Sequence, residues 1–101
     1  EKTGQFGPAA GAKGRGEFLS WRMFAACGIG PSSGQAVHFK HFAPEKVPYA
    51  HTRYQYEADR HYSVADRRLA ESRYLAGDSY SVVDMGLWGW ARMVPFILGD
   101  E

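Results

Sequence analysis

The sequence predicts an all-α fold, a partial helical bundle with three main helices. Apolar residues recur at helical spacing in three segments, and no segment alternates between apolar and polar residues as a half-buried strand would. A serine followed three residues later by an aspartate, Ser81 and Asp84, marks the start of the last helix. With 101 residues, 45% of them hydrophobic and 15% aromatic, the chain has the length and composition of one globular domain.

The first 16 residues predict a linker. They contain five glycines and a proline, which favour turns and loops over helices. We interpret residues 1–16 as a linker and residues 17–101 as one helical domain.

The first helix is expected over residues 17–27. Glu17 suits the positive end of the helix dipole, and Gly28 is expected to end the helix. Large apolar side chains cover most of its circumference. We therefore expect two faces of this helix to pack, with only Ser20 and Arg22 solvated.

Residues 28–48 predict a long connection, because glycines and a proline lie at its start and two prolines lie at its end. Its middle part, residues 35–42, could form a short helix. A connection of this length in a compact domain is usually functional.

The second main helix is expected from Pro48 to Glu71, with the proline in the first turn, where its missing N–H costs no hydrogen bond. Residues spaced by three or four positions predict one core-facing stripe: Tyr54, Ala58, Tyr62, Ala65 and Leu69. Two oppositely charged pairs four residues apart are expected to form ion pairs on the outer face: Arg53 with Glu57, and Arg67 with Glu71.

The third main helix begins with a capping box. The Ser81 hydroxyl can accept a hydrogen bond from an amide of the first turn, and the Asp84 carboxylate can accept one from the Ser81 amide. The helix has no polar stripe, since most of its positions are apolar: Val82, Val83, Met85, Leu87, Trp88, Trp90, Ala91, Met93 and Val94. A helix that is apolar all round must be surrounded. We therefore expect the chain to be part of a larger helical fold.

Several function classes are not favoured by the composition. The apolar run over residues 82–98 is shorter than the roughly 20 residues that span a bilayer. The net charge of +1 gives no strong attraction to nucleic acid. His38 and His41 have a spacing that can bind metal, but no carboxylate or cysteine nearby completes a set of ligands, so no metal site is expected. Cys27, the single cysteine, fits a reducing, cytoplasmic compartment and is expected to be a buried structural thiol.

Two sets of motifs resemble one known family. The motif Tyr74-Leu-Ala-Gly-Asp78, followed by the capping box and the tryptophan-rich helix, resembles the C-terminal helical domain of glutathione S-transferases. Further motifs are most similar to the bacterial nu-class branch, the disulfide-bond oxidoreductases: Gly28-Ile-Gly-Pro31, Gly34-Gln35, His38-Phe39, Ala43-Pro44, Pro48-Tyr49-Ala50 and Arg53-Tyr54. The chain departs from this pattern at residues 6–16, which are glycine-rich where the family tends to have a charged helix start.

The resemblance implies a parent enzyme that binds glutathione on a preceding thioredoxin-like domain and acts as a homodimer. Glutathione would serve in thiol-disulfide exchange, peroxide reduction or conjugation to electrophiles, with no metal and with no catalytic residue in this chain. The resemblance also implies that Arg53 holds a carboxylate of glutathione; the alternative is a surface arginine paired with Glu57. Trp21, Phe24 and Tyr49 would line the pocket for the second substrate, unless they are ordinary core residues. A non-catalytic domain that acts as a protein-interaction or structural module stays open as the alternative function.

Overall fold

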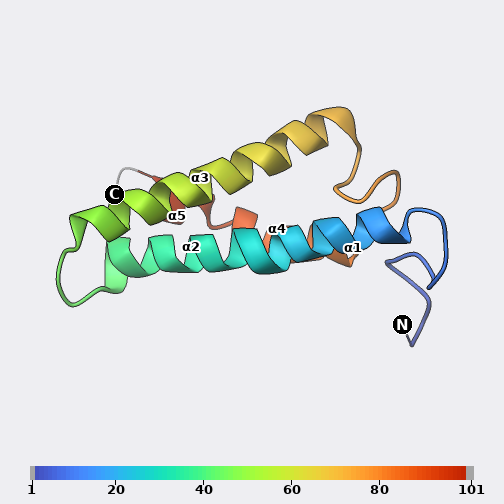
Figure 1. The fold of residues 1–101 in the computed structure, drawn as a ribbon, viewed down its shortest axis with the longest axis horizontal. Coiled ribbons are helices and arrows are strands. Elements are labelled where there is room, and N and C mark those ends of the chain that lie inside the picture. Colours follow the sequence, from blue (N-terminus) through green and yellow to red (C-terminus); the bar gives the residue numbers. More distant parts are fainter. Residues whose placement is uncertain (1, 100–101) are drawn as a thin grey trace.

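The computed structural model describes residues 2–99 and confirms the all-α prediction (Figure 1). The helical elements of the described part are α1 (Arg15–Phe24), η1 (Ala25–Ile29), α2 (Gly30–Val37), η2 (His38–Phe42), α3 (Pro48–Glu71), α4 (Val82–Ala91) and α5 (Val94–Leu98). The described part of the chain has a Cα radius of gyration of 15.3 Å, whereas a compact chain of this length has a radius of gyration of about 13 Å. The described part is therefore elongated, with extents of 48 × 28 × 19 Å.

The first four elements form one continuous helix from Arg15 to Phe42 (Figure 1). The prediction that Gly28 ends the first helix is therefore wrong, and so is the prediction of a long connection over residues 28–48. η1 is a π-helical turn that joins α1 to α2, and η2 is a second π-helical turn that ends the long helix.

Contacts with α3 and local backbone chemistry explain why the helix continues. A Cβ atom on Gly28 would lie 2.6 Å from Cδ2 of His61, so the glycine lets α3 lie close to the long helix. Pro31 has no N–H to donate, but it follows a π-helical turn in which the N–H of Gly30 donates to the Ala25 carbonyl. Gly28 thus lies inside a helix, and its lack of a side chain makes room for His61 of α3.

The long helix ends before a proline. Ala43 is extended, with φ −58° and ψ 134°, as the residue before a proline such as Pro44 prefers. A connection of residues 43–47 then leads into α3, which begins at Pro48 and ends at Glu71. Both predicted ends of this helix are confirmed.

The core-facing stripe of α3 is confirmed in its centre and wrong at its end. Ala58 and Ala65 are buried, and the Tyr54 ring stacks on that of Phe39 with centroids 5.6 Å apart. Leu69, in contrast, is 42% exposed. The long helix and α3 therefore pack most closely along the middle of α3, where alanines permit a close approach.

Most of the buried apolar residues fall into two groups. The larger group contains Phe18, Ile29, Ala65, Leu75, Val83 and Leu87. The smaller group contains Ala36, Ala58 and Ile97. Tyr62 packs against both groups, and its hydroxyl lies 2.7 Å from the Ser33 hydroxyl. Burial raises the pKa of Tyr62, and the hydrogen bond with Ser33 partly opposes this rise.

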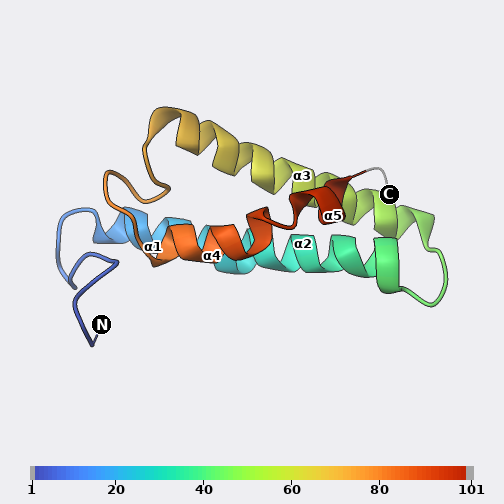
Figure 2. The ribbon, with the colours of Figure 1, turned by 180° about the vertical axis from the view of Figure 1, so that it is seen from behind.

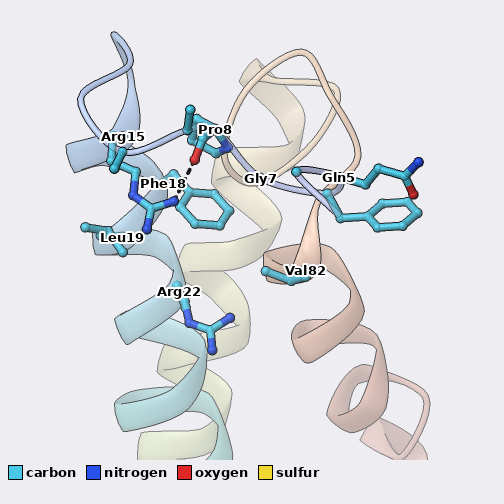
Figure 3. A pocket seen from close by; sticks show the side chains of 12 residues that line it. Gln5, Gly7, Pro8, Arg15, Phe18, Leu19, Arg22 and Val82 are labelled. Carbon is cyan, nitrogen blue, oxygen red and sulfur yellow. Dashed lines mark hydrogen bonds between the residues drawn. The ribbon is translucent and has the colours of Figure 1, made fainter. Parts of the chain in front are cut away.

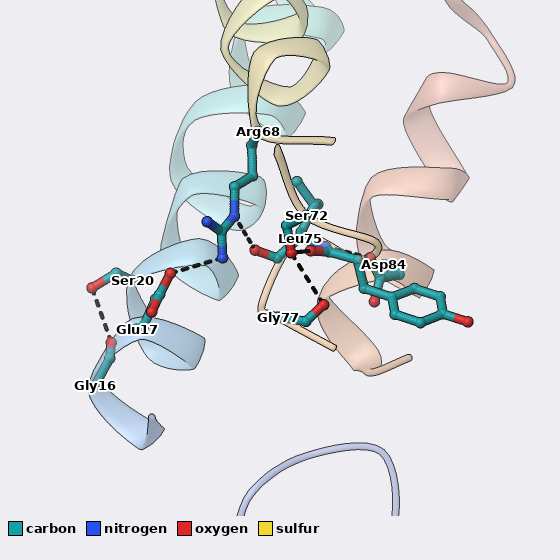
Figure 4. Close-up of polar contacts among 9 residues, drawn as sticks. Gly16, Glu17, Ser20, Arg68, Ser72, Leu75, Gly77 and Asp84 are labelled. Atoms are coloured by element: carbon teal, nitrogen blue, oxygen red, sulfur yellow. Dashed lines mark hydrogen bonds and ion pairs between the residues drawn. The ribbon is translucent and has the colours of Figure 1, made fainter. Parts of the chain in front are cut away.

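The turn between α3 and α4 is held by Arg68 and Asp84 (Figure 4). The structure contains the capping box: the Ser81 hydroxyl accepts from the Val83 amide at 3.2 Å, and Asp84 accepts from the Ser81 amide at 3.0 Å. The other carboxylate oxygen of Asp84 accepts from the amide of the fully buried Leu75, also at 3.0 Å. Arg68 donates to the Leu75 carbonyl. The start of α4 is thus tied to the end of α3.

The tryptophan-rich helix is only partly covered. α4 and α5 run along one side of the long helix (Figure 2). Val83 and Leu87 of α4 are buried, but Trp88 is 66% exposed and Trp90 36%. Within the described residues, α4 packs mainly against α1 and η1 of the long helix. The helix is thus only partly covered there, and the expectation that it belongs to a larger helical fold stays a prediction.

Other surface residues also differ from the predictions. Cys27 is exposed rather than buried, because the helix continues past it and turns this side chain away from the core. Leu19 and Met23 are exposed as well, so α1 has more solvated positions than expected. Glu57 pairs with Arg60 at 2.8 Å instead of Arg53.

Candidate functional site

Arg53 and Tyr49 lie on one exposed face of α3. They are four residues apart on the same helix, so their side chains project in the same direction. Tyr49 is 78% exposed, and Arg53 is exposed too. Arg53 makes no hydrogen bond or ion pair with any residue in the range 2–99. Its guanidinium group is therefore available to a ligand.

The charge of Arg53 acts on Glu57 from a distance. The pKa of Glu57 is lowered mainly by the hydrogen bond from Arg60, and desolvation opposes this effect. Electrostatic interactions with Arg60, His61 and Arg53 lower the pKa further. The structure therefore contains no pair of Arg53 with Glu57, whose carboxylate is held by Arg60, and the role of Arg53 in ligand binding stays a prediction.

Trp21 and Phe24 lie on the side of α1 that faces α3. Their rings meet edge to face with centroids 5.4 Å apart. The Phe24 ring stacks on the His61 imidazole at 5.6 Å, and the Arg68 guanidinium lies 5.3 Å from the Trp21 ring centroid. Both aromatic residues pack against the larger core group.

The predicted site residues therefore form two groups along α3. A helix rises about 1.5 Å per residue, so Arg53 is about 12 Å along the axis from His61 and about 22 Å from Arg68. Trp21 and Phe24 contact the second half of α3, whereas Tyr49 and Arg53 lie near its start. The role of these aromatic residues in substrate binding stays a prediction.

A cavity that the sequence did not predict lies between α1, the start of α4 and the glycine-rich segment Gly4–Ala10 (Figure 3). Its volume is about 680 Å³. The segment is fixed at two points: the Phe6 carbonyl accepts from the Val82 amide at 3.0 Å, and Arg15 donates to the Pro8 carbonyl at 2.6 Å. Residues 4–10 therefore form an ordered wall of this cavity, and the interpretation of residues 1–16 as a linker stays a prediction.

The wall that α1 gives to this cavity has a signal in the sequence. Arg15, Phe18, Leu19 and Arg22 are spaced by three, one and three positions, which places them on one face of a helix. The opposite wall is formed by residues 4–10, which lie within the stretch that was expected to be a linker.

A second cavity, of about 560 Å³, lies at the other end of the molecule. Most of the residues that line it are of polar types: Lys40, His51, Thr52, Gln55, Tyr56, Asp59, Leu98 and Gly99. Lys40 donates to the Gly99 carbonyl, and the His41 ring stacks on Phe96 with centroids 3.9 Å apart. These contacts hold α5 against the end of the long helix.

The described residues contain no group of three or more histidine, cysteine, aspartate or glutamate side chains that could hold a metal ion. None of the helices in residues 2–99 is both long enough and apolar enough to cross a membrane.

Comparison with curated proteins identifies close sequence relatives. The chain is 42% identical over 92 residues to the disulfide-bond oxidoreductase YfcG of Escherichia coli K12, which covers 91% of the chain and 42% of YfcG. It is also 42% identical over 91 residues to the disulfide-bond oxidoreductase YghU of the same organism, which covers 89% of the chain and 31% of YghU. The chain thus spans less than half of the length of these relatives. No family model matches it.

Solved structures show the same similarity in the fold. The glutathione transferase URE2P6 of Phanerochaete chrysosporium, solved with oxidized glutathione, matches with a TM-score of 0.85 and 30% identity over 96% of the chain and 44% of URE2P6. The glutathione transferase BgramDRAFT_1843 of Burkholderia graminis, solved with two glutathione molecules per subunit, matches with a TM-score of 0.84 and 33% identity over 96% of the chain and 43% of that protein. By sequence and by fold, the chain is thus related to the glutathione transferases, with the helical architecture of their C-terminal domain and with the disulfide-bond oxidoreductases among its sequence relatives.

Proposed function

We propose that this chain supplies the helical part of a glutathione-dependent enzyme of the disulfide-bond oxidoreductase type. The observation that carries the proposal is the 42% identity to two such oxidoreductases, over 91% and 89% of the chain. The similarity in fold to glutathione transferases that were solved with glutathione supports it further.

In the proposed reaction, the sulfur of glutathione is the reacting group. Its thiolate attacks one sulfur of a disulfide, so that a new S–S bond forms, the old one breaks and the leaving sulfur departs as a thiolate. The same thiolate would attack a peroxide or an electrophile. No thiol of this chain is needed, and the exposed Cys27 has no role in the proposal.

The complete protein in this proposal is a cytoplasmic homodimer in which residues 1–16 follow a thioredoxin-like domain that carries glutathione. The apolar wall of the second-substrate pocket includes Trp21 and Phe24, with Tyr49 at its far end. The packing of Trp21 between Phe24 and Arg68 supports this role, because it holds the indole ring in a fixed orientation.

Arg53 is proposed to hold a carboxylate of glutathione. Its guanidinium group is planar and always charged, and it can bind a carboxylate through two parallel hydrogen bonds. Glu57, the nearest predicted competitor, is engaged by Arg60 in the structure. The exposed position of Arg53 leaves it open to a ligand bound on a neighbouring domain.

The test is glutathione-dependent reduction of a small disulfide by the full-length protein. In the Arg53→Ala variant, the KM for glutathione should rise at least about tenfold, because a hydrogen-bonded charge pair contributes about 1.5–3 kcal/mol and about 1.4 kcal/mol corresponds to a factor of ten. Arg53→Lys keeps the charge but cannot form two parallel hydrogen bonds, so its KM for glutathione should lie between those of the wild type and Arg53→Ala. Arg67→Ala, an exposed arginine on the same helix, is the matched control and should leave KM unchanged.

A specific result would favour the interaction-module alternative. If the full-length protein neither binds glutathione nor reduces disulfides, but retains a defined protein partner, then the enzymatic proposal is wrong. Equal kinetics of the Arg53→Ala and Arg67→Ala variants would overturn the assignment of Arg53 and leave the reaction itself intact.

A further inference from the structure

We propose that Arg68 is a positioning residue for the second substrate, because its guanidinium group lies over the indole ring of Trp21 and is itself fixed by two hydrogen bonds. This inference rests on the proposed function, in which Trp21 belongs to the wall of the second-substrate pocket. Arg68 does not touch the substrate. It sets the orientation of the ring that the substrate meets.

Three separate contacts hold the Arg68 side chain. Its Nε donates to the Leu75 carbonyl at 2.8 Å, and its Nη2 donates to the Glu17 carboxylate, also at 2.8 Å (Figure 4). Its guanidinium carbon lies 5.3 Å from the centroid of the Trp21 ring. Only 20% of this side chain is exposed. Arg68 of α3 thus joins α1 and the turn before α4 at one point.

These contacts fix the indole ring of Trp21. A guanidinium group over an indole is attracted by the negative face of the ring. The Phe24 ring meets the Trp21 ring edge to face, with centroids 5.4 Å apart. Trp21 is nevertheless only half-buried. It therefore presents an ordered flat surface on which an aromatic group of a substrate can stack.

Glu17 places the guanidinium group beside the indole. It lies in the first turn of α1, and Trp21 follows it by four residues, so both side chains project from the same face of this helix. The Glu17 side chain is 55% exposed. A pair with such an exposed partner adds little to the stability of a fold. The Glu17–Arg68 pair therefore matters mainly for where Arg68 lies.

Steady-state kinetics of the full-length protein at saturating glutathione, with two uncharged disulfides, tests this role. Bis(4-hydroxyphenyl) disulfide carries aromatic rings, and bis(2-hydroxyethyl) disulfide does not. In Arg68→Gln, the KM for the aromatic disulfide should rise about fivefold, as expected for one lost cation–π contact, with little change in kcat. The KM for the aliphatic disulfide should stay within about twofold of the wild type, and Arg68→Lys should recover part of the loss.

Two further variants separate positioning from a merely structural role. Arg73→Gln removes an exposed arginine that lies 5.6 Å from the Tyr74 ring centroid, and as the matched control it should behave like the wild type. Glu17→Gln leaves the core intact, so it tests the same contact if Arg68→Gln does not fold. Its KM for the aromatic disulfide should rise about twofold, because Arg68 loses one anchor.

A double-mutant cycle shows whether Arg68 acts through Trp21. In the Trp21→Leu background, Arg68→Gln should have no further effect on the KM for the aromatic disulfide, whereas independent roles would give additive effects. Additive effects, or equal rises in KM for both disulfides, would overturn the proposal. So would wild-type kinetics of both Arg68→Gln and Glu17→Gln. These results leave glutathione-dependent reduction by the wild-type protein intact, and its absence would instead refute the proposed function together with this inference.

A spectroscopic measurement tests the positioning without turnover. In the full-length protein labelled with fluorotryptophan, the fluorine NMR signal of position 21 is the one that disappears in Trp21→Leu. This signal should shift in Arg68→Gln and stay in place in Arg73→Gln, because only Arg68 lies over the Trp21 ring. An unmoved signal in Arg68→Gln would show that Arg68 does not position the indole, whatever the enzyme's activity.

Discussion

The Asp84 carboxylate holds two backbone amides from different parts of the turn, so its removal should destabilise the fold strongly. One oxygen accepts from the buried Leu75 amide and the other from the Ser81 amide, both at 3.0 Å. A hydrogen bond to a charged group contributes about 1.5–3 kcal/mol. Asp84→Ala should therefore lower the free energy of unfolding by about 3 kcal/mol, a large share of the roughly 5–15 kcal/mol typical of a domain.

Urea denaturation of the full-length protein measures this loss, and two variants sharpen it. Asp84→Asn keeps one acceptor oxygen but turns an NH₂ group toward the other backbone amide. Its loss in free energy of unfolding should therefore be about half that of Asp84→Ala. Asp78→Ala removes an exposed carboxylate from the same turn and should change stability by less than about 0.5 kcal/mol. If Asp84→Ala and Asp78→Ala unfold at the same urea concentration, the reasoning about the two amides is refuted.

Three other substitutions test the packing and the ionisable groups. Gly28→Ala should lower stability by about 1 kcal/mol in a thermal melt, because its Cβ would lie 2.6 Å from the His61 ring and overpacking costs roughly 1–3 kcal/mol against about 1 kcal/mol gained in helix propensity; an unchanged or higher Tm would contradict this. Burial raises the pKa of Tyr62 above its ordinary value of 10.0, so the contribution of the neutral phenol to stability is complete below pH 10 and is lost as the pH rises through the folded-state pKa. The Tyr62→Phe variant should therefore lose less stability than the wild type between pH 8 and pH 11, as measured by urea denaturation at each pH. If both proteins lose the same amount over this interval, the assignment is wrong. Arg60→Ala should raise the pKa of Glu57 in a carbon NMR titration, because the hydrogen bond from Arg60 is the main cause of its lowering; an unmoved pKa would show that the pair does not persist in solution.

Local signals predicted the parts of the fold that depend on local chemistry. The capping box needs only Ser81 and Asp84 at the right spacing, and the ends of α3 follow from Pro48 and the spacing of apolar residues. These features lie within a few residues of one another, so the sequence contains them almost completely.

The errors came from residues whose environment is set by other parts of the chain. Gly28 has the usual character of a helix end, but the close approach of His61 keeps it inside a helix. One error has a local cause instead, because Arg60 lies three residues beyond Glu57 on the same helix and takes the carboxylate that was expected to pair with Arg53. The cavity beside Arg22 depends on the docking of residues 4–10 onto α1 and α4, and no local pattern encodes that docking.

The candidate site was predictable only in part for the same reason. The motif that contains Tyr49 and Arg53 could be recognised, and both residues are exposed on one face of α3. The separation of this pair from Trp21 and Phe24 along α3 is a property of the helix packing. A pocket that joins the two groups would have to span a large part of the helix.

Calorimetric measurement of glutathione binding to the full-length protein tests the central claim most directly. The account predicts saturable binding by the wild-type protein, with a Kd at least about tenfold higher for Arg53→Ala, as expected for one lost charge-assisted contact. Absence of any binding of glutathione to the folded wild-type protein would contradict the claim that this chain belongs to a glutathione-dependent enzyme.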